Sequence, residues 1–251
     1  MGKRQTEILY GFHPVKEAFK AGRRKIVRMC TLRSHGPKRM MEVLTYAANA
    51  RVPIQEVSLS KMEALTQTDK HQGVCVEAGF YPLVSLQELC DRAEAVPTGG
   101  RLLLLDSIVD PHNLGALIRT ACCTAVEGIV ITKDRSATPT PTVSKTSAGA
   151  LEHVRLARVT NMTQTIKRLQ QQGLWVVGLA GEADRSIYDS DFTGPIALVI
   201  GSEFNGLRPL VKKSCDQLVS IPQTGVIDSL NASVAGGIAI YEIYRQQLAN
   251  T

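Results

Sequence analysis

The sequence has 251 residues, of which 44% are hydrophobic and 21% are charged, with a formal net charge of +6. This composition excludes a disordered chain, and the length suits one large domain or two modest ones. No apolar run approaches the roughly 20 residues of a membrane-spanning helix, and the first residues hold no stretch of signal-peptide length, so a cytoplasmic protein without membrane contact is expected.

The six cysteines form no C-x-x-C pair and share no spacing with histidine that is typical of a zinc site. In a chain of this length they indicate small, mostly buried thiols in a reducing compartment rather than a disulfide framework. The sequence therefore predicts no metal site.

Positive charge is concentrated at the N-terminal end. The first 39 residues hold 11 Lys or Arg and 2 Glu, a net charge of +9, so the rest of the chain sums to −3. A basic end on a near-neutral body is typical of a module that binds a polyanion, most often nucleic acid. The alternative is a basic surface that contacts only solvent.

The first 80 residues alternate between strand and helix patterns. An apolar start at Ile8 is followed by a Gly–Phe–His–Pro turn and a helix that begins near Pro14. Further strands are expected over 25–32, 50–58 and 73–80, with helices over 40–50 and 61–67. This alternation predicts a small α/β domain.

A linker is expected after the first domain. A helix is predicted over 86–95, and Pro97, Gly99 and Gly100 follow it. A Pro/Gly cluster after a single helix is typical of a linker, so the domain boundary is predicted between Phe80 and Arg101.

The rest of the chain alternates again, beginning with a strand over 102–106 that is apolar up to its final Asp, of the kind that is buried on both faces of a parallel sheet. A polar turn is expected over 110–115, followed by a helix through Ile118. Further strands are expected over 128–132, 154–159, 175–180, 196–200 and 218–221, and helices around 145–150, over 163–172 and 207–213, and from Ala232 through Ile243. The pattern predicts a parallel α/β architecture.

Two loops at strand ends carry concentrated polar chemistry, at the place where ligands bind in parallel sheets. The first loop holds Asn113, and Arg119 lies in the helix that follows. The second, LVIGSEFNGL, holds Glu203 between Gly201 and Gly206.

A third such loop, IPQTGVIDSLNAS, places Asp228, Ser229 and Asn231 at the start of the last helix. Taken alone, these side chains indicate helix capping, because their oxygens satisfy unpaired backbone N–H groups. A fourth loop, 178–182, has two glycines that permit a ligand to approach the backbone closely.

The usual nucleotide-binding and hydrolase fingerprints are absent. The sequence contains no G-x-G-x-x-G after a strand, no G-x-x-x-x-G-K-[ST] and no G-x-S-x-G. It therefore supports neither a Rossmann dinucleotide site, nor a P-loop, nor a serine-hydrolase elbow.

Together, N-x-x-A-x-x-R in the first loop, G-S-E-x-N-G-L in the second and I-P…S-L-N-x-S in the third resemble the three motifs of the SpoU (TrmH-type) family of RNA ribose 2′-O-methyltransferases. The motifs agree in order and spacing, and the resemblance covers essentially the whole chain. The stretches YGFHPVKEAF and HQGVCVEA resemble the small substrate-binding domain, similar to ribosomal protein L30e, of the bacterial members that modify 23S rRNA guanosine.

The resemblance implies a fold and partners that composition alone could not show. It implies an L30e-like RNA-binding α/β domain over 1–80, a linker over 81–100 and a SPOUT methyltransferase α/β domain over 101–251. It also implies that the second domain is tied in a deep trefoil knot, works as a homodimer and holds S-adenosylmethionine in the knot.

The resemblance also implies site residues. The first-motif pair is Asn113 and Arg119, the second-motif carboxylate is Glu203, and the third-motif polar pair is Ser229 and Asn231. The cofactor pocket is expected to be formed largely by backbone around Leu179, Ala180, Gly181, Gly201, Ile221 and Leu230.

Methyl transfer to a ribose hydroxyl needs orientation of the reactants and a group that stabilises the developing alkoxide. A guanidinium is effectively always charged, so Arg119 is expected to bind the RNA phosphate and the alkoxide rather than to act as a base. For Glu203 an alternative stays open, because a carboxylate at the start of the helix over 207–213 would be favoured by the helix dipole.

Two rival functions remain at this point. One is a non-catalytic RNA-binding or ribosome-assembly protein on the same fold, against which the complete set of motif residues argues. The other is methylation of tRNA instead of rRNA.

Overall fold

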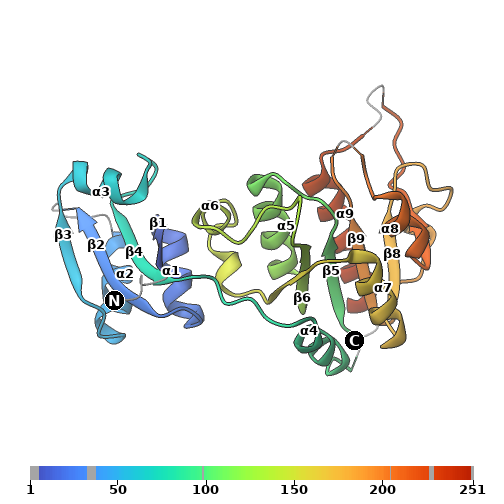
Figure 1. Ribbon diagram of the computed structural model, residues 1–251, viewed down its shortest axis with the longest axis horizontal. Coiled ribbons are helices and arrows are strands. Elements are labelled where there is room, and N and C mark those ends of the chain that lie inside the picture. The colour runs from blue at the N-terminus through green and yellow to red at the C-terminus, as the bar shows by residue number, and fades with distance from the viewer. Residues whose placement is uncertain (1–5, 33–37, 98, 204, 226–228, 250–251) are drawn as a thin grey trace. The chain divides into compact units, whose positions relative to one another are not determined.

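The computed structural model describes residues 6–32, 38–97, 99–203, 205–225 and 229–249 (Figure 1). The chain forms two compact units. The first unit consists of Met1–Pro82 with Pro139–His153, and the second of Leu83–Thr138 with Val154–Thr251. Within the described ranges, no helix has both the length and the apolar character needed to cross a membrane.

The first unit is built on a mixed four-stranded sheet with the order β1-β4-β2-β3. The strands are β1 (Thr6–Tyr10), β2 (Ile26–Leu32), β3 (Ile54–Val57) and β4 (Val74–Gly79), and the helices between them are α1 (Phe12–Ala21), α2 (Lys38–Asn49) and α3 (Leu59–Thr66). Strand β4 is antiparallel to β1 and β2, whereas β2 and β3 are parallel. The small α/β domain predicted from the sequence is confirmed.

The two faces of this sheet carry separate cores, because successive side chains of a strand point to opposite faces. On β2, Met29 packs in a cluster with Val15 of α1 and Val43 of α2. The next residue, Cys30, packs in a second cluster with Met62 of α3. Helices therefore cover both faces of the sheet.

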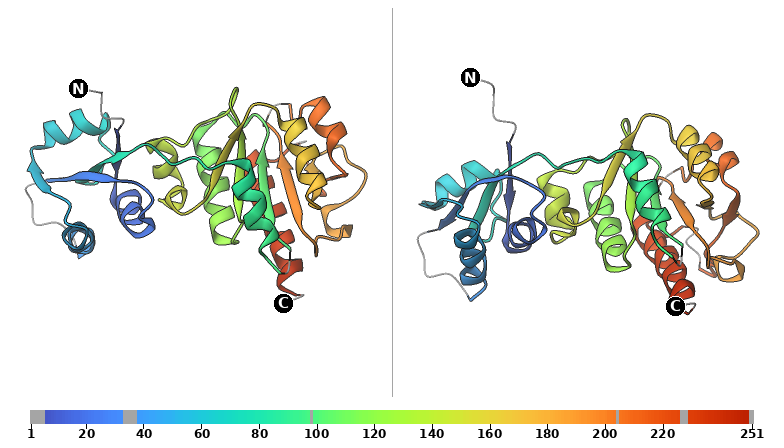
Figure 2. Two further views of the ribbon diagram at one scale, coloured as in Figure 1. Left: turned by 60° about the horizontal axis from the view of Figure 1, so that its bottom comes forward. Right: turned by 90° about the horizontal axis from the view of Figure 1, so that it is seen from below.

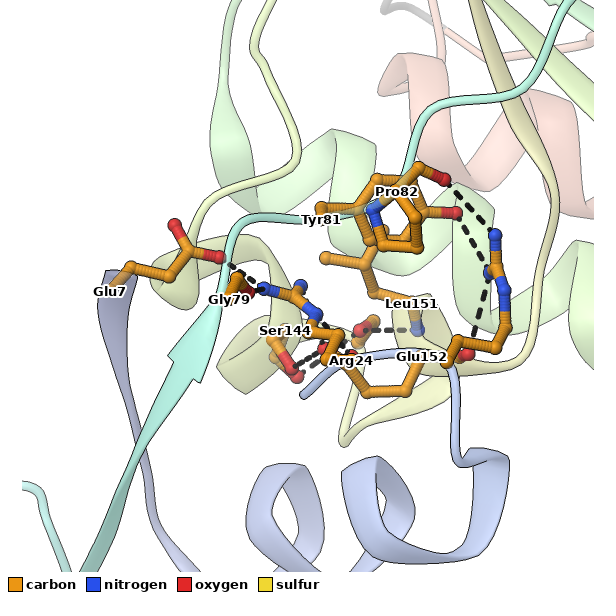
Figure 3. A network of polar contacts seen from close by, with 10 residues as sticks. Glu7, Arg24, Gly79, Tyr81, Pro82, Ser144, Leu151 and Glu152 are labelled. Atoms are coloured by element: carbon orange, nitrogen blue, oxygen red, sulfur yellow. Dashed lines mark hydrogen bonds and ion pairs between the residues drawn. The ribbon is translucent and has the colours of Figure 1, made fainter. Parts of the chain in front are cut away.

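Residues 139–153, which lie in the C-terminal half of the sequence, fold with the first unit. They contain the helix α6 (Pro141–Thr146) and the 3₁₀ turn η1 (Ala150–Glu152). A cluster of buried charges holds them there (Figure 3). The Arg24 side chain is 1% exposed, and its Nε lies 2.6 Å from Glu152 Oε2, in a carboxylate that is also 1% exposed. Arg24 also pairs with Glu7, and Ser144 Oγ donates to Glu152 Oε1 at 2.8 Å.

A neighbouring arginine adds to the same attachment. Arg23 donates to the Pro82 carbonyl at 3.1 Å, to Tyr81 Oη at 3.2 Å and to the Glu152 carbonyl at 3.4 Å. The guanidinium groups of Arg23 and Arg24 both lie 5.2 Å from the centre of the Tyr81 ring. Residues 139–153 are thus held against β1 and against Tyr81 and Pro82, which follow β4, by one continuous network of polar contacts.

The second unit is built on a six-stranded parallel sheet with the order β10-β8-β9-β5-β6-β7. The strands are β5 (Arg101–Leu105), β6 (Gly128–Thr132), β7 (Leu156–Val159), β8 (Trp175–Leu179), β9 (Ile196–Ile200) and β10 (Gln217–Val219). Every strand predicted for this half is present, and the parallel architecture is confirmed.

Helices cover both faces of this sheet (Figure 2). One face packs against α4 (Leu86–Glu94), α7 (Met162–Gln171) and α8 (Pro209–Ser214). On the other side, α5 (Pro111–Cys123) packs against α9 (Ala232–Leu248). Gly236 of α9 permits this close approach, since a Cβ there would lie 2.4 Å from Leu117 and 2.6 Å from Ile200.

Several sequence predictions about helix bounds are wrong: α1 begins at Phe12 rather than near Pro14, and α8 begins at Pro209 rather than at Leu207. The stretch 110–115 is not a turn, because α5 begins at Pro111, with the Asp110 side chain accepting from the His112 N–H as its cap. The helix expected over 145–150 spans Pro141–Thr146, and it ends where Ala148 and Gly149 adopt positive φ.

All six cysteines are free thiols, as predicted, but they are not uniformly buried. Cys30, Cys75 and Cys90 are buried, whereas Cys123 is exposed. Burial raises the pKa of Cys75 and of Cys215 to about 12, so these two thiols are poor nucleophiles at neutral pH.

Candidate active site

A cavity of about 280 Å³ lies at the carboxyl ends of strands β8, β9 and β10. Its wall is formed by three chain segments that follow these strands: 179–182 after β8, 200–207 at the end of β9, and a third running from Ile221 to Ala235, of which Ile221, Gln223, Ser229, Leu230, Ala232 and Ala235 contact the cavity. This is the position in which parallel α/β sheets bind ligands.

All six residues expected to hold a cofactor contact this cavity: Leu179, Ala180, Gly181, Gly201, Ile221 and Leu230. Glu203 and Ser229 contact it as well. The structure thus brings eight of the eleven predicted site residues to one wall, while their individual roles stay predictions.

The side chain of Asn231 joins the three motif loops. Its Nδ2 donates to Asn113 Oδ1 at 3.1 Å and to Glu203 Oε1 at 3.2 Å. Its Oδ1 accepts from the backbone N–H groups of Ser233 at 2.9 Å and of Val234 at 3.3 Å. These donors fix the orientation of the amide, so its NH₂ group faces Asn113 and Glu203.

Asn231 therefore has two functions at once. It is the N-cap of α9, as its residue type indicates, because its oxygen satisfies two of the unpaired N–H groups at the helix start. The other end of the same amide makes the contacts to the first and second motifs. Capping and a role in the site are not alternatives here.

Asn113 is 7% exposed and lies in the first turn of α5, whose cap is Asp110. Its own side chain is therefore not a cap and is free to accept from Asn231. The hydrogen bond joins residues 118 positions apart in the sequence.

The helix-start alternative for Glu203 is wrong. Helix α8 begins at Pro209 and Arg208 is its N-cap residue, so Glu203 lies well before the first turn. Its carboxylate instead accepts from Asn231 and contacts the cavity. The helix was predicted to begin at Leu207 because Leu207 continues the apolar pattern of the helix, although it lies before the first turn.

Arg119 is not brought to the cavity wall. It lies exposed on α5, six residues after Asn113, which places it about 120° around the helix from Asn113. Among the described residues it has no hydrogen bond or ion pair, so its guanidinium is available to an anion. Asp228, predicted at the same loop as Ser229, lies outside the described residues.

Sequence reasoning missed two polar residues of the wall, Gln223 and Ser202. Both lie inside recognised motif loops, so spacing alone could not single them out. It also misjudged Gly178, where a Cβ would lie 2.7 Å from Leu218 and 2.8 Å from Leu207. That glycine is required by packing in the core rather than by a ligand.

The cavity suits a ligand with an apolar ring and positive charge. Its wall combines apolar side chains with the carboxylates of Glu182 and Glu203, and none of the described wall residues is Lys, Arg or His. Glu182 is paired with Lys212, so Glu203 is the carboxylate without a cation partner among the described residues. A sulfonium and an ammonium group fit beside such a wall, whereas a polyphosphate does not. No group of three or more metal-binding side chains occurs in the described part of the chain.

Comparison with known proteins agrees with this geometry. Residues 100–241 match the SpoU rRNA Methylase family, and residues 8–83 match the family described as RNA 2'-O ribose methyltransferase substrate binding. The chain belongs to the SpoU rRNA methylase family. Like the family, it is an S-adenosylmethionine-dependent RNA 2′-O-ribose methyltransferase, which confirms the prediction from the three motifs.

Two relatives are similar over nearly their whole length, and both are named 23S rRNA (guanosine-2'-O-)-methyltransferase RlmB. The protein of Pseudomonas putida is 39% identical over 97% of this chain and 98% of its own, and that of Ralstonia nicotianae is 40% identical over 97% of each. The crystal structure of the SpoU methyltransferase AviRb from Streptomyces viridochromogenes in complex with AdoMet has a TM-score of 0.80 at 24% identity, covering 98% of this chain and 91% of AviRb. That structure shares the fold.

Gly201, in the second loop of the cavity wall, has no room for a side chain. A Cβ at Gly201 would lie 2.1 Å from the carbonyl carbon of Gly206. We expect Gly201→Ala to push the loop into the cavity and to weaken S-adenosylmethionine binding by about tenfold or more, measured by calorimetry. In the control Gly194→Ala, the new Cβ meets nothing within 4 Å, and affinity should be unchanged. Equal affinity of both variants would contradict the placement.

Proposed function

We propose that this chain methylates the ribose 2′-hydroxyl of a guanosine in 23S rRNA. The observation that carries the proposal is the Asn113–Asn231–Glu203 contact beside the cavity, because it joins all three motifs in one place. The names of the two RlmB relatives support the choice of RNA and nucleotide. A target in rRNA also agrees with the cytoplasmic location expected from the sequence.

The bound S-adenosylmethionine supplies the methyl group. The protein and the RNA must supply the rest of the rate enhancement, and most of that enhancement comes from orienting the reactants. Asn231 is held at both ends of its amide, so the loop that carries Ser229 and Leu230 enters the site in one conformation. Ser229 then presents a hydroxyl at the cavity wall, where it can orient the ribose.

Arg119 is assigned to the RNA rather than to the cofactor. Its guanidinium is exposed and has no partner among the described residues, and it presents donors in a planar fork that matches a phosphate. In that position it stabilises the negative charge that develops when the hydroxyl loses its proton. The hydroxyl proton passes to solvent water.

We propose the division of labour expected from the sequence. Residues 1–80 form the RNA-binding domain and 101–251 the methyltransferase domain, with a trefoil knot at the cofactor site. Residues 139–153 are an exception, because they fold with the first unit, and α4 of the expected linker 81–100 packs in the core of the second unit. The matched family regions, 8–83 and 100–241, support these boundaries. Exposed basic residues of this domain, such as Lys25 and Arg39, supply phosphate affinity that does not depend on sequence, whereas Arg24 is buried against Glu152.

We also propose that the enzyme is a homodimer. Helix α9 exposes Val234, Tyr241 and Leu248, each about half accessible. Their spacing of seven residues places them on one side of the helix, opposite the face packed in the second unit. A second copy of the chain would cover this apolar stripe, as the family resemblance implies.

Disruption of the stripe should separate the subunits. We expect Tyr241→Lys to raise the dissociation constant of the dimer at least about tenfold, since an ammonium buried in an apolar interface costs several kcal/mol. Light scattering after size exclusion measures this. Trp175→Lys replaces an equally exposed aromatic residue on β8 and should leave the dimer intact. A monomeric wild-type protein would contradict the proposal.

The proposed reaction is tested by mapping 2′-O-methyl groups. Purified protein is incubated with unmodified 23S rRNA and, separately, with bulk tRNA, in the presence of S-adenosylmethionine. We expect methylation of a guanosine in 23S rRNA alone. Methylation confined to tRNA would support the rival substrate, and methylation of neither RNA would support a non-catalytic protein.

A further inference from the structure

A buried carboxylate outside the three motifs holds the second motif loop in place. Asp106 directly follows β5 and is 0% exposed. Its carboxylate is paired with Arg208, whose Nη2 lies 2.6 Å and whose Nε lies 2.8 Å from Asp106 Oδ1. The backbone N–H of Arg208 donates to Asp106 Oδ2 at 3.1 Å. Arg208 comes directly after the loop 201–207, which forms one wall of the cavity.

The same residue also holds the other end of that loop. The backbone N–H of Asp106 donates to the Ile200 carbonyl at 2.8 Å. Ile200 precedes the loop and Arg208 follows it, so both ends are bonded to the one residue that follows the neighbouring strand β5. Between them, Ser202 and Gly206 exchange two backbone hydrogen bonds of 3.0 and 2.9 Å.

A buried carboxylate at position 106 is expected to reduce the stability of the fold. Burying a charge carries a desolvation penalty that its partner only partly offsets, and apolar residues at such sites are often as stable or more stable. The hydrogen bonds of β5 do not need the side chain. The carboxylate is therefore explained by its contact with Arg208. Without that contact the Arg208 side chain, which is 44% exposed, would be free to turn into solvent.

We propose that Asp106 is a positioning residue: by binding Arg208 it fixes the loop that carries Gly201 and Glu203 in the conformation that accepts S-adenosylmethionine. The inference rests on the assignment of this cavity to the cofactor. Asp106 itself does not contact the cavity. Its effect passes through the backbone of the loop to Glu203, which in turn accepts from Asn231.

The chain offers a closely matched control at the opposite end of the same strand. Arg101, the first residue of β5, also binds one carboxylate, that of Glu127, through both its backbone N–H and its guanidinium. Both of these side chains are largely buried, at 13% and 11% exposure. Asp106→Asn and Glu127→Gln therefore remove the same kind of charge from the same kind of contact, but only one of them touches the loop.

Two measurements on the full-length protein test the proposal. Hydrogen exchange without cofactor should show the amides of Ser202 and Gly206 exchanging about tenfold faster or more in Asp106→Asn than in wild type, as the loss of a charged hydrogen bond predicts. Calorimetry should show S-adenosylmethionine binding weakened by a similar factor, with RNA affinity unchanged. Glu127→Gln should leave loop exchange and both affinities at wild-type values.

Arg208→Lys provides a second variant, because it retains the positive charge but loses the planar fork. We expect it to fall between wild type and Asp106→Asn in loop exchange and in cofactor affinity. Unchanged exchange at Ser202 and Gly206 in Asp106→Asn would overturn the proposal, as would equal changes in Glu127→Gln. Failure of the wild-type protein to bind S-adenosylmethionine would instead overturn the cofactor assignment, and the exchange result would still report on the loop.

Discussion

Replacement of Arg119 by alanine is expected to lower kcat by about 100- to 1000-fold, the effect of removing one preorganised charge-stabilising donor. The guanidinium does not contact the cavity, so S-adenosylmethionine binding should be unchanged. Arg119→Lys should lose most of the same activity, because an ammonium cannot offer the planar fork. The measurement is single-turnover methylation with both substrates saturating.

The control for Arg119 is Arg158→Ala. Arg158 is likewise exposed and lies on β7 in the second unit, so its removal takes the same charge from the protein. It should weaken RNA binding slightly, with little change in rate at saturation. If Arg119→Lys retained most of the wild-type turnover, the phosphate-fork role would be wrong.

The second large effect is expected on stability. Arg24→Met removes the cation from a cluster in which Glu152 is 1% and Glu7 is 15% exposed. It removes the ion-pair partner of one buried and one half-buried carboxylate, which should reduce the free energy of unfolding by about 3–5 kcal/mol. Lys16→Met is the control, since it removes an exposed ion pair with Glu42 in the same unit and should change stability little.

The loss in Arg24→Met should depend on pH. Burial already raises the pKa of Glu7, against the opposing effect of Arg24. When folding raises the pKa of a carboxyl, the folded state is destabilised by its ionisation. The free energy of unfolding of the variant should therefore fall further below that of the wild type as the pH rises through the pKa of Glu7. Urea unfolding followed by circular dichroism at about pH 5 and about pH 8 checks this. An equal loss at both values would contradict the explanation.

The two units provide an internal reference for that experiment. The only tryptophan, Trp175, lies on β8 in the second unit, so its fluorescence reports on the part that does not contain Arg24. We expect the tryptophan transition to move less than the circular dichroism transition in Arg24→Met. Coincident shifts would mean that the units unfold as one.

Strands buried on both faces were the elements most accurately predicted from the sequence. The predicted bounds of β6 and β9 agree with the structure at both ends, because these continuous apolar runs have only one stable environment. The start of α5 was not predicted, since Asp110–Pro111 is equally typical of a turn. Only the contact of the Asp110 side chain with the His112 N–H distinguishes a capped helix from that turn.

The attachment of 139–153 to the first unit could not have been predicted. The Arg24–Glu152 pair joins residues 128 positions apart, and neither belongs to a recognised motif. The motif residues were identified because their order along the chain is itself informative. Their positions in space could not be predicted from this order. Asn231 both caps α9 and bonds to the first and second motifs, and Arg119 does not line the cavity.

We propose that S-adenosylmethionine binds in the cavity at the carboxyl ends of β8, β9 and β10. A second cavity in the same unit is the alternative binding site. A larger cavity of about 710 Å³, lined in part by Glu94, Gln172 and Gly194, lies at the amino ends of the strands. Hydrogen exchange of the intact protein with and without S-adenosylmethionine decides between the two. We predict protection of 179–182, 200–207 and 229–235 with no change around Gln172 and Gly194, whereas protection confined to the larger cavity, or no protection anywhere, would contradict the account.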